Sequence, residues 1–221
     1  MIDFHTHVLP AADHGSDCLK TSLSQLTLAE QAGITTLIAT PHFYPQLEEL
    51  DSFLERRDAA WTELRKAYHG PLELRLGAEV HLCGGLDHLD GLEQLCVDGT
   101  NVLLLELGFR AWAKDVTDTV LRIAEDGRFF PVLAHVDRYQ PEPIEELLDA
   151  GISAQLNADA FCRLLGRRRL CDWIDKGDIV ALGSDIHGTA VGYKNYTKAK
   201  SYLKDRFDIV MSRTEKLIKK G

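Results

Sequence analysis

Several features that would assign this chain to a specialised class are scarce or missing. No apolar run approaches the roughly 20 residues that a membrane-spanning helix needs, and the first residues lack the basic-then-apolar pattern of a signal peptide. The chain has five cysteines, an odd number, and no two of them are separated by the two residues of a CxxC motif. They are Cys18, Cys83, Cys96, Cys162 and Cys171. We therefore expect a cytoplasmic protein with reduced thiols.

Basic residues are also in short supply. The chain has 25 Lys and Arg against 34 Asp and Glu, a net charge of −9. Such a chain is a poor general binder of nucleic acids or anionic membranes, so neither is an expected partner. Its 221 residues, 45% hydrophobic, suit one globular core. No linker or low-complexity segment interrupts them, and we predict a single domain over residues 1–221.

Short apolar runs alternate with longer amphipathic stretches along the whole chain. Seven runs resemble buried parallel strands: Ile2–His5, Thr35–Ala39, Leu72–Ala78, Val102–Leu105, Pro131–Ala134, Ser153–Leu156 and Ile179–Leu182. The stretches between them have helical periodicity, with Gly33 and Gly151 at apparent helix ends. The alternation predicts an α/β fold. Because no GxGxxG fingerprint follows the first strand, a distorted (β/α)7 barrel is favoured over a dinucleotide-binding sheet.

Histidines and carboxylates follow the predicted strands. They are His5 and His7, His42, Glu79, Glu106, His135, and the pair Asp185 and His187, with His14 in the loop after the first strand. The carboxyl ends of parallel barrel strands converge on one face, so these side chains should meet there. Six of the nine histidines belong to this set, while His69, His81 and His88 are expected to lie outside it.

Nine potential ligands are more than one ion uses, so the set predicts two or three divalent cations. Any one of these histidines alone is more often a core or surface residue than a ligand. Their joint placement favours a metal site, because unpaired charges are costly to bury. Nitrogen and oxygen ligands without thiolate suit manganese, iron or zinc.

The motifs resemble those of the PHP (polymerase and histidinol phosphatase) superfamily. They are His5-Thr6-His7, His14, Thr40-Pro41-His42, Glu79, His135 and Asp185-Ile186-His187. More narrowly, Ile2–Pro10, Leu103–Glu106, Ala134–Tyr139 and Gln155–Asn157 resemble the bacterial manganese-dependent protein tyrosine phosphatases of capsule and exopolysaccharide loci. The resemblance runs from Met1 to about His187.

This resemblance implies a trinuclear site on a TIM-like barrel. One metal would be held by His5, His7, Glu79 and Asp185, a second by Glu79, Glu106 and His135, and the third by His14, His42 and His187. Arg138 matches the phosphate-binding arginine. Two departures stand out: position 14 is usually Asp in the tyrosine phosphatase branch, and a second arginine after the Asp-x-His motif is missing. Lys194 is a weak candidate replacement, since lysine lacks the bidentate fork of arginine.

The function implied is hydrolysis of phosphotyrosine by a metal-bound hydroxide, with Arg138 and Asp185 as catalytic residues and manganese as the expected metal. The substrate would be a phosphorylated protein tyrosine, a tyrosine autokinase among the candidates. A small-molecule phosphomonoesterase of the histidinol-phosphatase type and a catalytically silent metal-binding barrel remain alternatives. Amidohydrolases and metal-dependent DNases also begin with H-x-H but fit the later motifs less well. Cys162 and Arg168 satisfy the C-x5-R spacing of cysteine phosphatases, although the segment between them has a helical pattern.

Overall fold

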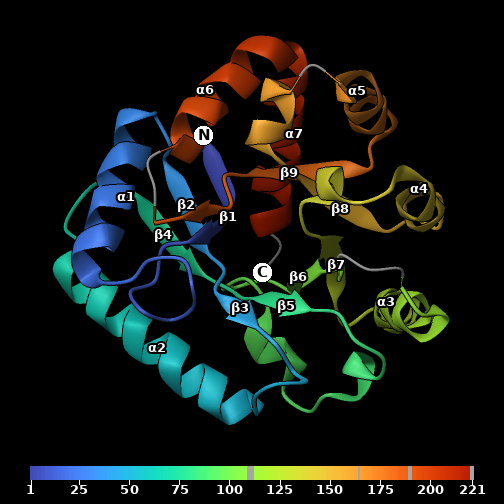
Figure 1. The fold of residues 1–221 in the computed structure, drawn as a ribbon, viewed down its shortest axis with the longest axis horizontal. Helices are drawn as coiled ribbons and strands as arrows, with labels where there is room; N and C mark the ends of the chain where they lie inside the picture. Colours follow the sequence, from blue (N-terminus) through green and yellow to red (C-terminus); the bar gives the residue numbers. More distant parts are fainter. Residues whose placement is uncertain (109–111, 164, 189–190, 220–221) are drawn as a thin grey trace.

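Strands and helices alternate in the computed structural model, which describes residues 1–108, 112–163, 165–188 and 191–219 (Figure 1). The strands are β1 (Ile2–His7), β2 (Thr36–Ala39), β3 (His42–Phe43), β4 (Glu73–Leu76), β5 (Glu79–His81), β6 (Val102–Glu106), β7 (Phe130–Leu133), β8 (Ser153–Asn157), β9 (Ile179–Gly183) and β10 (Ile186–His187). The helices are α1 (Leu19–Gln31), α2 (Leu50–Ala67), α3 (Lys114–Asp126), α4 (Pro141–Asp149), α5 (Arg167–Lys176), α6 (Val191–Leu203) and α7 (Asp205–Ile218). The α/β prediction is confirmed, and each of the seven predicted runs overlaps a strand.

All strand pairs are parallel, but the hydrogen-bonded ladders form two sheets. One has the order β10-β1-β2-β4 and the other β3-β5-β6-β7-β8-β9. The short strands β3, β5 and β10 were not predicted. Each continues an earlier strand after a two-residue break, at Thr40-Pro41, Gly77-Ala78 and Ser184-Asp185. The breaks transfer pairing from one sheet to the other: β2 pairs with β4, and beyond both breaks β3 pairs with β5.

Helices surround the strands on the outside (Figure 1). Because this covers one face of every strand while the strands fill the middle, β6 is buried along its entire length. The helices contribute apolar stripes, such as Phe53, Ala60 and Leu64 of α2. Gly33 and Gly151 adopt positive φ of 82° and 90° after helix ends, as their positions predicted. The described elements share one hydrophobic core.

Two other predictions from the sequence can be compared with the described residues. None of their helices combines the length and the hydropathy that a bilayer crossing requires. All five cysteines are free thiols, as expected, and three of them, Cys83, Cys96 and Cys171, are buried.

The strand breaks bring backbone into unusual conformations beside polar side chains. His135, just after β7, has φ of +34°, and Asp185, in the break after β9, has φ of +51°. Non-glycine residues in this region cost about 1–3 kcal/mol each and concentrate at functional sites. The backbone thus departs from regular strand geometry where it presents two of the predicted ligands.

Gly183, the last residue of β9, lies against the first histidine of the chain. A Cβ at this position would stand 2.5 Å from the Cβ of His5 and 2.7 Å from the Nε2 of Gln155. Only a residue without a side chain lets β9 approach β1 this closely.

Gly183→Ala should therefore lower the free energy of unfolding by about 1–3 kcal/mol through overpacking. Urea unfolding of the metal-free protein measures it. Gly108→Ala is the matched control, because its nearest contact would be an ordinary 3.7 Å to His81. Equal stability of the two variants would contradict the packing argument.

Candidate metal centre

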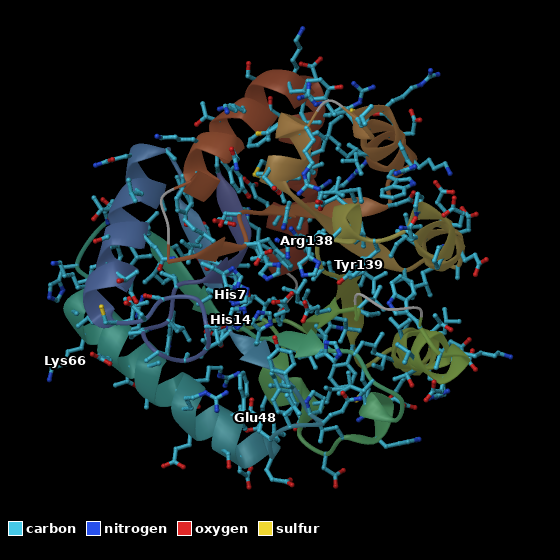
Figure 2. All side chains as sticks on the ribbon, in the orientation of Figure 1. His7, His14, Glu48, Lys66, Arg138 and Tyr139 are labelled. Carbon is cyan, nitrogen blue, oxygen red and sulfur yellow. The ribbon has the colours of Figure 1, made fainter. Side chains whose placement is uncertain are left out.

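The strand ends bring the predicted residues together at the centre of the fold, where His7, His14 and Arg138 lie inside the surrounding helices (Figure 2). β1 supplies His5 and His7, β3 supplies His42, and β5 and β6 supply Glu79 and Glu106. His135 follows β7, and Asp185 and His187 come from the break after β9 and from β10. All of these except the half-buried His187 are buried.

Glu79 occupies the middle of the cluster. Its Oε2 lies 3.1 Å from His5 Nε2, 3.2 Å from His7 Nε2 and 3.0 Å from His42 Nδ1. Its Oε1 lies 2.8 Å from His135 Nε2. A carboxylate surrounded by four imidazole nitrogens is placed to bridge cations.

The ring orientations of His5 and His7 are fixed from behind. His7 Nδ1 donates to Asp13 Oδ2 at 2.6 Å, and His5 Nδ1 donates to Gln155 Oε1 at 3.3 Å. With the Nδ1 proton committed, the Nε2 lone pair of each neutral ring points inward. The two Nε2 atoms are only 3.1 Å apart. Two converging lone pairs repel each other unless a cation lies between them.

His135 and His187 are arranged in the same way. The Tyr139 hydroxyl donates to the carbonyl of Leu107 at 2.7 Å, so the contact of 3.2 Å between Tyr139 and His135 Nδ1 leaves the imidazole as the donor. His187 Nδ1 donates to the backbone carbonyl of Asp185 at 3.0 Å. Metal-binding histidines commonly have such outer acceptors, which hold the ring in place and leave the other nitrogen free to ligate.

Buried polar atoms without a hydrogen-bond partner mark where a cation fits. Among the described residues, Glu79 Oε2, His42 Nδ1 and His187 Nε2 have none. The first two lie 3.0 Å apart but lack hydrogen-bonding geometry. Leaving buried polar groups unpaired costs about 1–3 kcal/mol each. This donor set of nitrogen and oxygen atoms fits divalent cations.

The electrostatics agree with this fit. Burial alone would raise the pKa of Glu79, but His5, His135 and His42 hold it well below its ordinary value. Burial opposes protonation of His5 and His7, yet nearby carboxylates raise the pKa of each: Glu79 and Asp185 act on His5, and Asp13, Asp185 and Glu79 act on His7. Positive charge is thus favoured at the inward nitrogens, where a cation would replace the proton.

The pKa of His187 shifts in the opposite direction. Burial, reinforced by the charge of His7, lowers its pKa to about 4. The ring is therefore neutral at physiological pH, which keeps the lone pair of its Nε2 available.

Three groups of side chains have ligand atoms close enough to share one ion. They are His5, His7 and Asp185; His42, Glu79 and Glu106; and His7, His42 and His187, with ligand atoms within 4.8 Å of one another. His14 joins the third group, because its ring centroid lies 4.6 Å from that of His42 and 4.8 Å from that of His187. All nine predicted ligands therefore lie in one cluster.

His81, which the sequence analysis left outside the ligand set, lies at the edge of the cluster. Its Nδ1 is 3.5 Å from Glu106 Oε2, and its ring is 5.7 Å from that of Tyr44, which stacks on His42. His81 closes β5 two residues after Glu79, so it projects to the same side. That spacing was the signal available in the sequence.

Arg138 reaches the cluster as predicted. Instead of forming a surface ion pair with Asp137 or Glu142, it pairs with Asp185 Oδ2, which also accepts from Asn157 Nδ2 at 3.1 Å. Asp185 Oδ1 faces His7 Nε2 at 3.2 Å. Burial alone would raise the pKa of Asp185, but His5, His7 and Arg138 hold it well below its ordinary value. Lys194 is exposed in the first turn of α6, and no described contact joins it to the cluster.

The cysteine-phosphatase alternative concerns the segment from Cys162 to Arg168, which the structure describes except for residue 164. Cys162 ends the 3-10 helix η4 (Ala158–Cys162) and donates to Asn195 Oδ1 at 3.5 Å. α5 begins at Arg167, after Gly166 at φ of 85°, so the expected helix is present at Arg167 but was wrong for residues 163, 165 and 166.

Two residues that orient the histidines were not assigned a role from the sequence. Asp13 accepts from His7, from the backbone N–H of His42 at 3.0 Å and from that of Gly15 at 2.8 Å. Gln155 accepts from His5 and from the backbone N–H of His135 at 2.7 Å. A polar side chain between Ala154 and Leu156 of a predicted buried strand was the available signal for Gln155. For Asp13 the signal was a carboxylate beside a candidate ligand.

Comparison with known proteins places this site in a family. The family model of capsular polysaccharide synthesis, CpsB/CapC, matches residues 1–218. The chain belongs to the CpsB/CapC family. It is 27% identical over 182 residues to the tyrosine-protein phosphatase YwqE of Bacillus subtilis, covering 76% of this chain and 68% of YwqE. It is 25% identical over 166 residues to the tyrosine-protein phosphatase CpsB of Streptococcus agalactiae, covering 72% of this chain and 68% of CpsB.

Solved structures agree on the fold of this CpsB/CapC member. A crystal structure from work on YwqE of Bacillus subtilis and CpsB of Streptococcus pneumoniae, described as metal-dependent tyrosine phosphatases, matches with a TM-score of 0.82 and 23% identity. The match covers 99% of this chain and 94% of that one. The resemblance found in the sequence is confirmed.

The hydrogen bond from His7 generates a testable prediction. Asp13→Ala should weaken metal binding by about 10- to 100-fold, the usual cost of losing an outer-sphere carboxylate. Competition with a chromogenic chelator measures it. Asp17→Ala is the control, because Asp17 is an exposed carboxylate that accepts from Thr21 at the surface. Unchanged affinity in Asp13→Ala would remove the assigned role.

Proposed function

We propose that this protein is a metal-dependent phosphomonoesterase that hydrolyses phosphotyrosine in proteins. One observation carries the proposal: His5, His7 and His135 each have Nδ1 engaged by an outer acceptor while Nε2 lies within 3.2 Å of Glu79. The names of the CpsB/CapC relatives, tyrosine-protein phosphatases YwqE and CpsB, supply the substrate class.

We assign three ions to the cluster, with manganese as the expected metal. His5, His7, Glu79 and Asp185 would hold the first, Glu79, Glu106 and His135 the second, and His14, His42 and His187 the third. The position of Glu79 between imidazoles supports its role as the shared ligand. Free thiols support the expected cytoplasmic location, which stays a prediction.

Bound divalent cations would supply a water that ionises near neutral pH and positive charge for the phosphoryl oxygens. The protein's own residues position the substrate. Arg138 uses one Nη on Asp185, and with five N–H donors in all it keeps others for a phosphoryl oxygen. Asp185 is the positioning carboxylate, since Asn157 and Arg138 fix one oxygen and the other faces His7. A tyrosyl leaving group, with a pKa of about 10, needs little protonation. Lys194 remains a weak candidate for a second phosphate contact.

A small phosphomonoester such as histidinol phosphate is the second candidate substrate. The TM-score of 0.54 to hisK of Listeria monocytogenes, at 14% identity, concerns the fold alone. The observation that favours this second candidate is the lack of a second arginine shortly after the Asp-x-His motif.

The decisive experiment combines metal analysis with turnover. Protein purified with manganese should bind two or three ions and hydrolyse a phosphotyrosine peptide faster than histidinol phosphate. Chelation should abolish turnover, while Cys162→Ser should leave it intact. His42→Ala and Glu106→Ala should each lose about 10²-fold or more of kcat while circular dichroism shows a folded protein. Near-wild-type turnover in both variants would refute the site.

Arg138 separates phosphate binding from metal binding. Arg138→Ala should lower kcat/KM by about 10- to 100-fold, since charge-assisted hydrogen bonds contribute about 1.5–3 kcal/mol. Arg138→Lys should recover part of this loss, because it keeps the charge without the fork. Metal content, measured by inductively coupled plasma mass spectrometry, should stay constant. A loss of metal in Arg138→Lys would instead assign Arg138 to holding Asp185.

A further inference from the structure

Positive charge collects in one part of this acidic protein. Residues 163–206 contain ten Lys and Arg against five Asp and Glu, although the whole chain carries −9. Four of the ten are Arg163 and the run Arg167–Arg169 around the start of α5. Three more are lysines of α6, a helix without an acidic residue. The local field therefore opposes that of the rest of the molecule.

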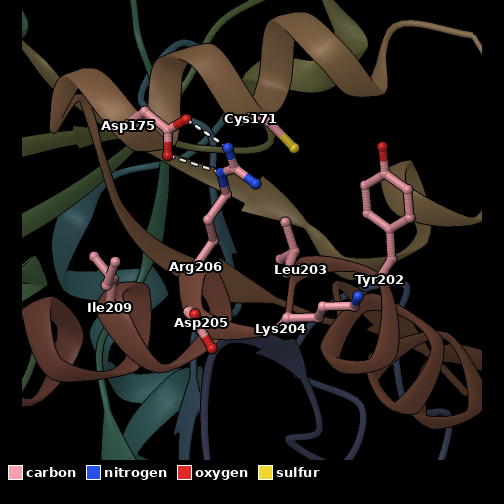
Figure 3. A pocket seen from close by; sticks show the side chains of 8 residues that line it. All are labelled: Cys171, Asp175, Tyr202, Leu203, Lys204, Asp205, Arg206 and Ile209. Atoms are coloured by element: carbon pink, nitrogen blue, oxygen red, sulfur yellow. Dashed lines mark hydrogen bonds and ion pairs between the residues drawn. The ribbon is translucent and has the colours of Figure 1, made fainter.

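Two neighbouring pockets open in this region, and Tyr202 lines both of them. The first, of about 530 Å³, is shown in Figure 3. Its guanidinium, Arg206, forms two bonds of 2.7 Å to the carboxylate of Asp175. Asp205 adds another acidic group to the lining. The acidic groups that line this pocket therefore neutralise its basic groups.

The second pocket, of about 410 Å³, keeps its charge. It is lined by Phe161, Cys162, Arg167, Lys198, Ser201 and Tyr202, from η4, α5 and α6. Among the described residues, no carboxylate lies within 4.0 Å of Arg167 or Lys198, and Arg167 Nε is buried without a hydrogen-bond partner. The nearby Asp159 is paired with Arg163 at 3.0 Å. By contrast, Arg213, a structural arginine, donates to two backbone carbonyls.

Stacking holds the guanidinium of Arg167 in place. Its central carbon lies 4.7 Å from the ring centroid of Tyr202, and the Tyr202 ring stacks on Phe161 at 6.0 Å. An arginine fixed through its flat face keeps its edge available for a carboxylate or a phosphate. The Ser201 hydroxyl and the Lys198 amine add donors on the same wall.

The pocket lies close to the metal centre along η4. Phe161 is four residues beyond Asn157, whose side chain contacts Asp185 at 3.1 Å. At about 2 Å rise per residue in a 3-10 helix, the pocket wall lies on the order of 10 Å from Asp185. An extended peptide covers this distance in about three to five residues.

We infer that this pocket binds an acidic or phosphorylated side chain of the same peptide that presents phosphotyrosine to the metal centre. The inference rests on the proposed function and narrows its substrate class to peptides with a second anionic residue three to five positions away. The volume of about 410 Å³ suits a single side chain, and two cations without a carboxylate partner among the described residues suit its charge.

The test compares three substrates: free phosphotyrosine, a phosphotyrosine peptide with alanine flanks, and peptides with glutamate four residues before or after phosphotyrosine. We expect one glutamate peptide to show a KM roughly three- to tenfold below that of the alanine peptide. The double variant Arg167→Glu with Lys198→Glu should abolish this difference and leave turnover of free phosphotyrosine within about twofold. The preference should also fade at high salt.

The matched control is Arg65→Glu with Lys66→Glu. It makes the same change in net charge on α2, far from α5 and α6 (Figure 2), and should preserve the preference.

Equal KM for all peptides in the wild type, or loss of preference in the control, would overturn the inference. Binding of fluorescent peptides to the metal-loaded protein, followed by anisotropy, tests the pocket independently of turnover. Failure of the proposed function would therefore be seen separately, as absent hydrolysis of free phosphotyrosine. Preferential binding of anionic lipid vesicles, without selectivity among the peptides, would also refute the inference about the pocket.

Discussion

The burial of Glu79 among imidazole nitrogens is the constraint on which the rest of the structure depends. A carboxylate removed from water is costly unless positive charge and hydrogen bonds compensate it. Here His5, His7, His42 and His135 approach its two oxygens within 3.2 Å. The pKa of Glu79 is lowered and those of His5 and His7 are raised. A metal-free cluster therefore has to hold protons where a loaded one would hold cations.

The irregular parts of the fold serve this cluster. Regular parallel strands would pair continuously, whereas β2, β4 and β9 each break before a ligand and resume as β3, β5 and β10. The breaks turn His42, Glu79 and Asp185 toward a common point, and Asp185 adopts a positive φ in doing so. Backbone strain at such positions is tolerated because hydrogen bonds from Asn157 and Arg138 hold the side chain in place. Stability and site geometry are therefore coupled through the same residues.

Charge is divided between two environments on the protein. The metal centre is rich in carboxylates that call for cations, while the segment from α5 to α6 carries an excess of arginine and lysine. Of two adjacent pockets there, one satisfies its arginine with Asp175 and the other leaves Arg167 without an internal acid. The net charge of the segment does not predict this difference between the pockets, because residues of the same basic segment line both of them.

The sequence by itself determined the α/β alternation, because buried parallel strands are short apolar runs and the helices between them keep a 3.6-residue period. It also predicted the nine candidate ligands that the structure brings into one cluster, because the carboxyl ends of parallel strands face one side. Only the tertiary structure decided where the strands break, since a break depends on which neighbour each half pairs with. It likewise brought Asp13, Gln155 and His81 to the cluster. The roles of Asp13 and Gln155 come from hydrogen bonds to His7 and His5 that depend on the folded arrangement, for which hydrophobic periodicity carries no signal.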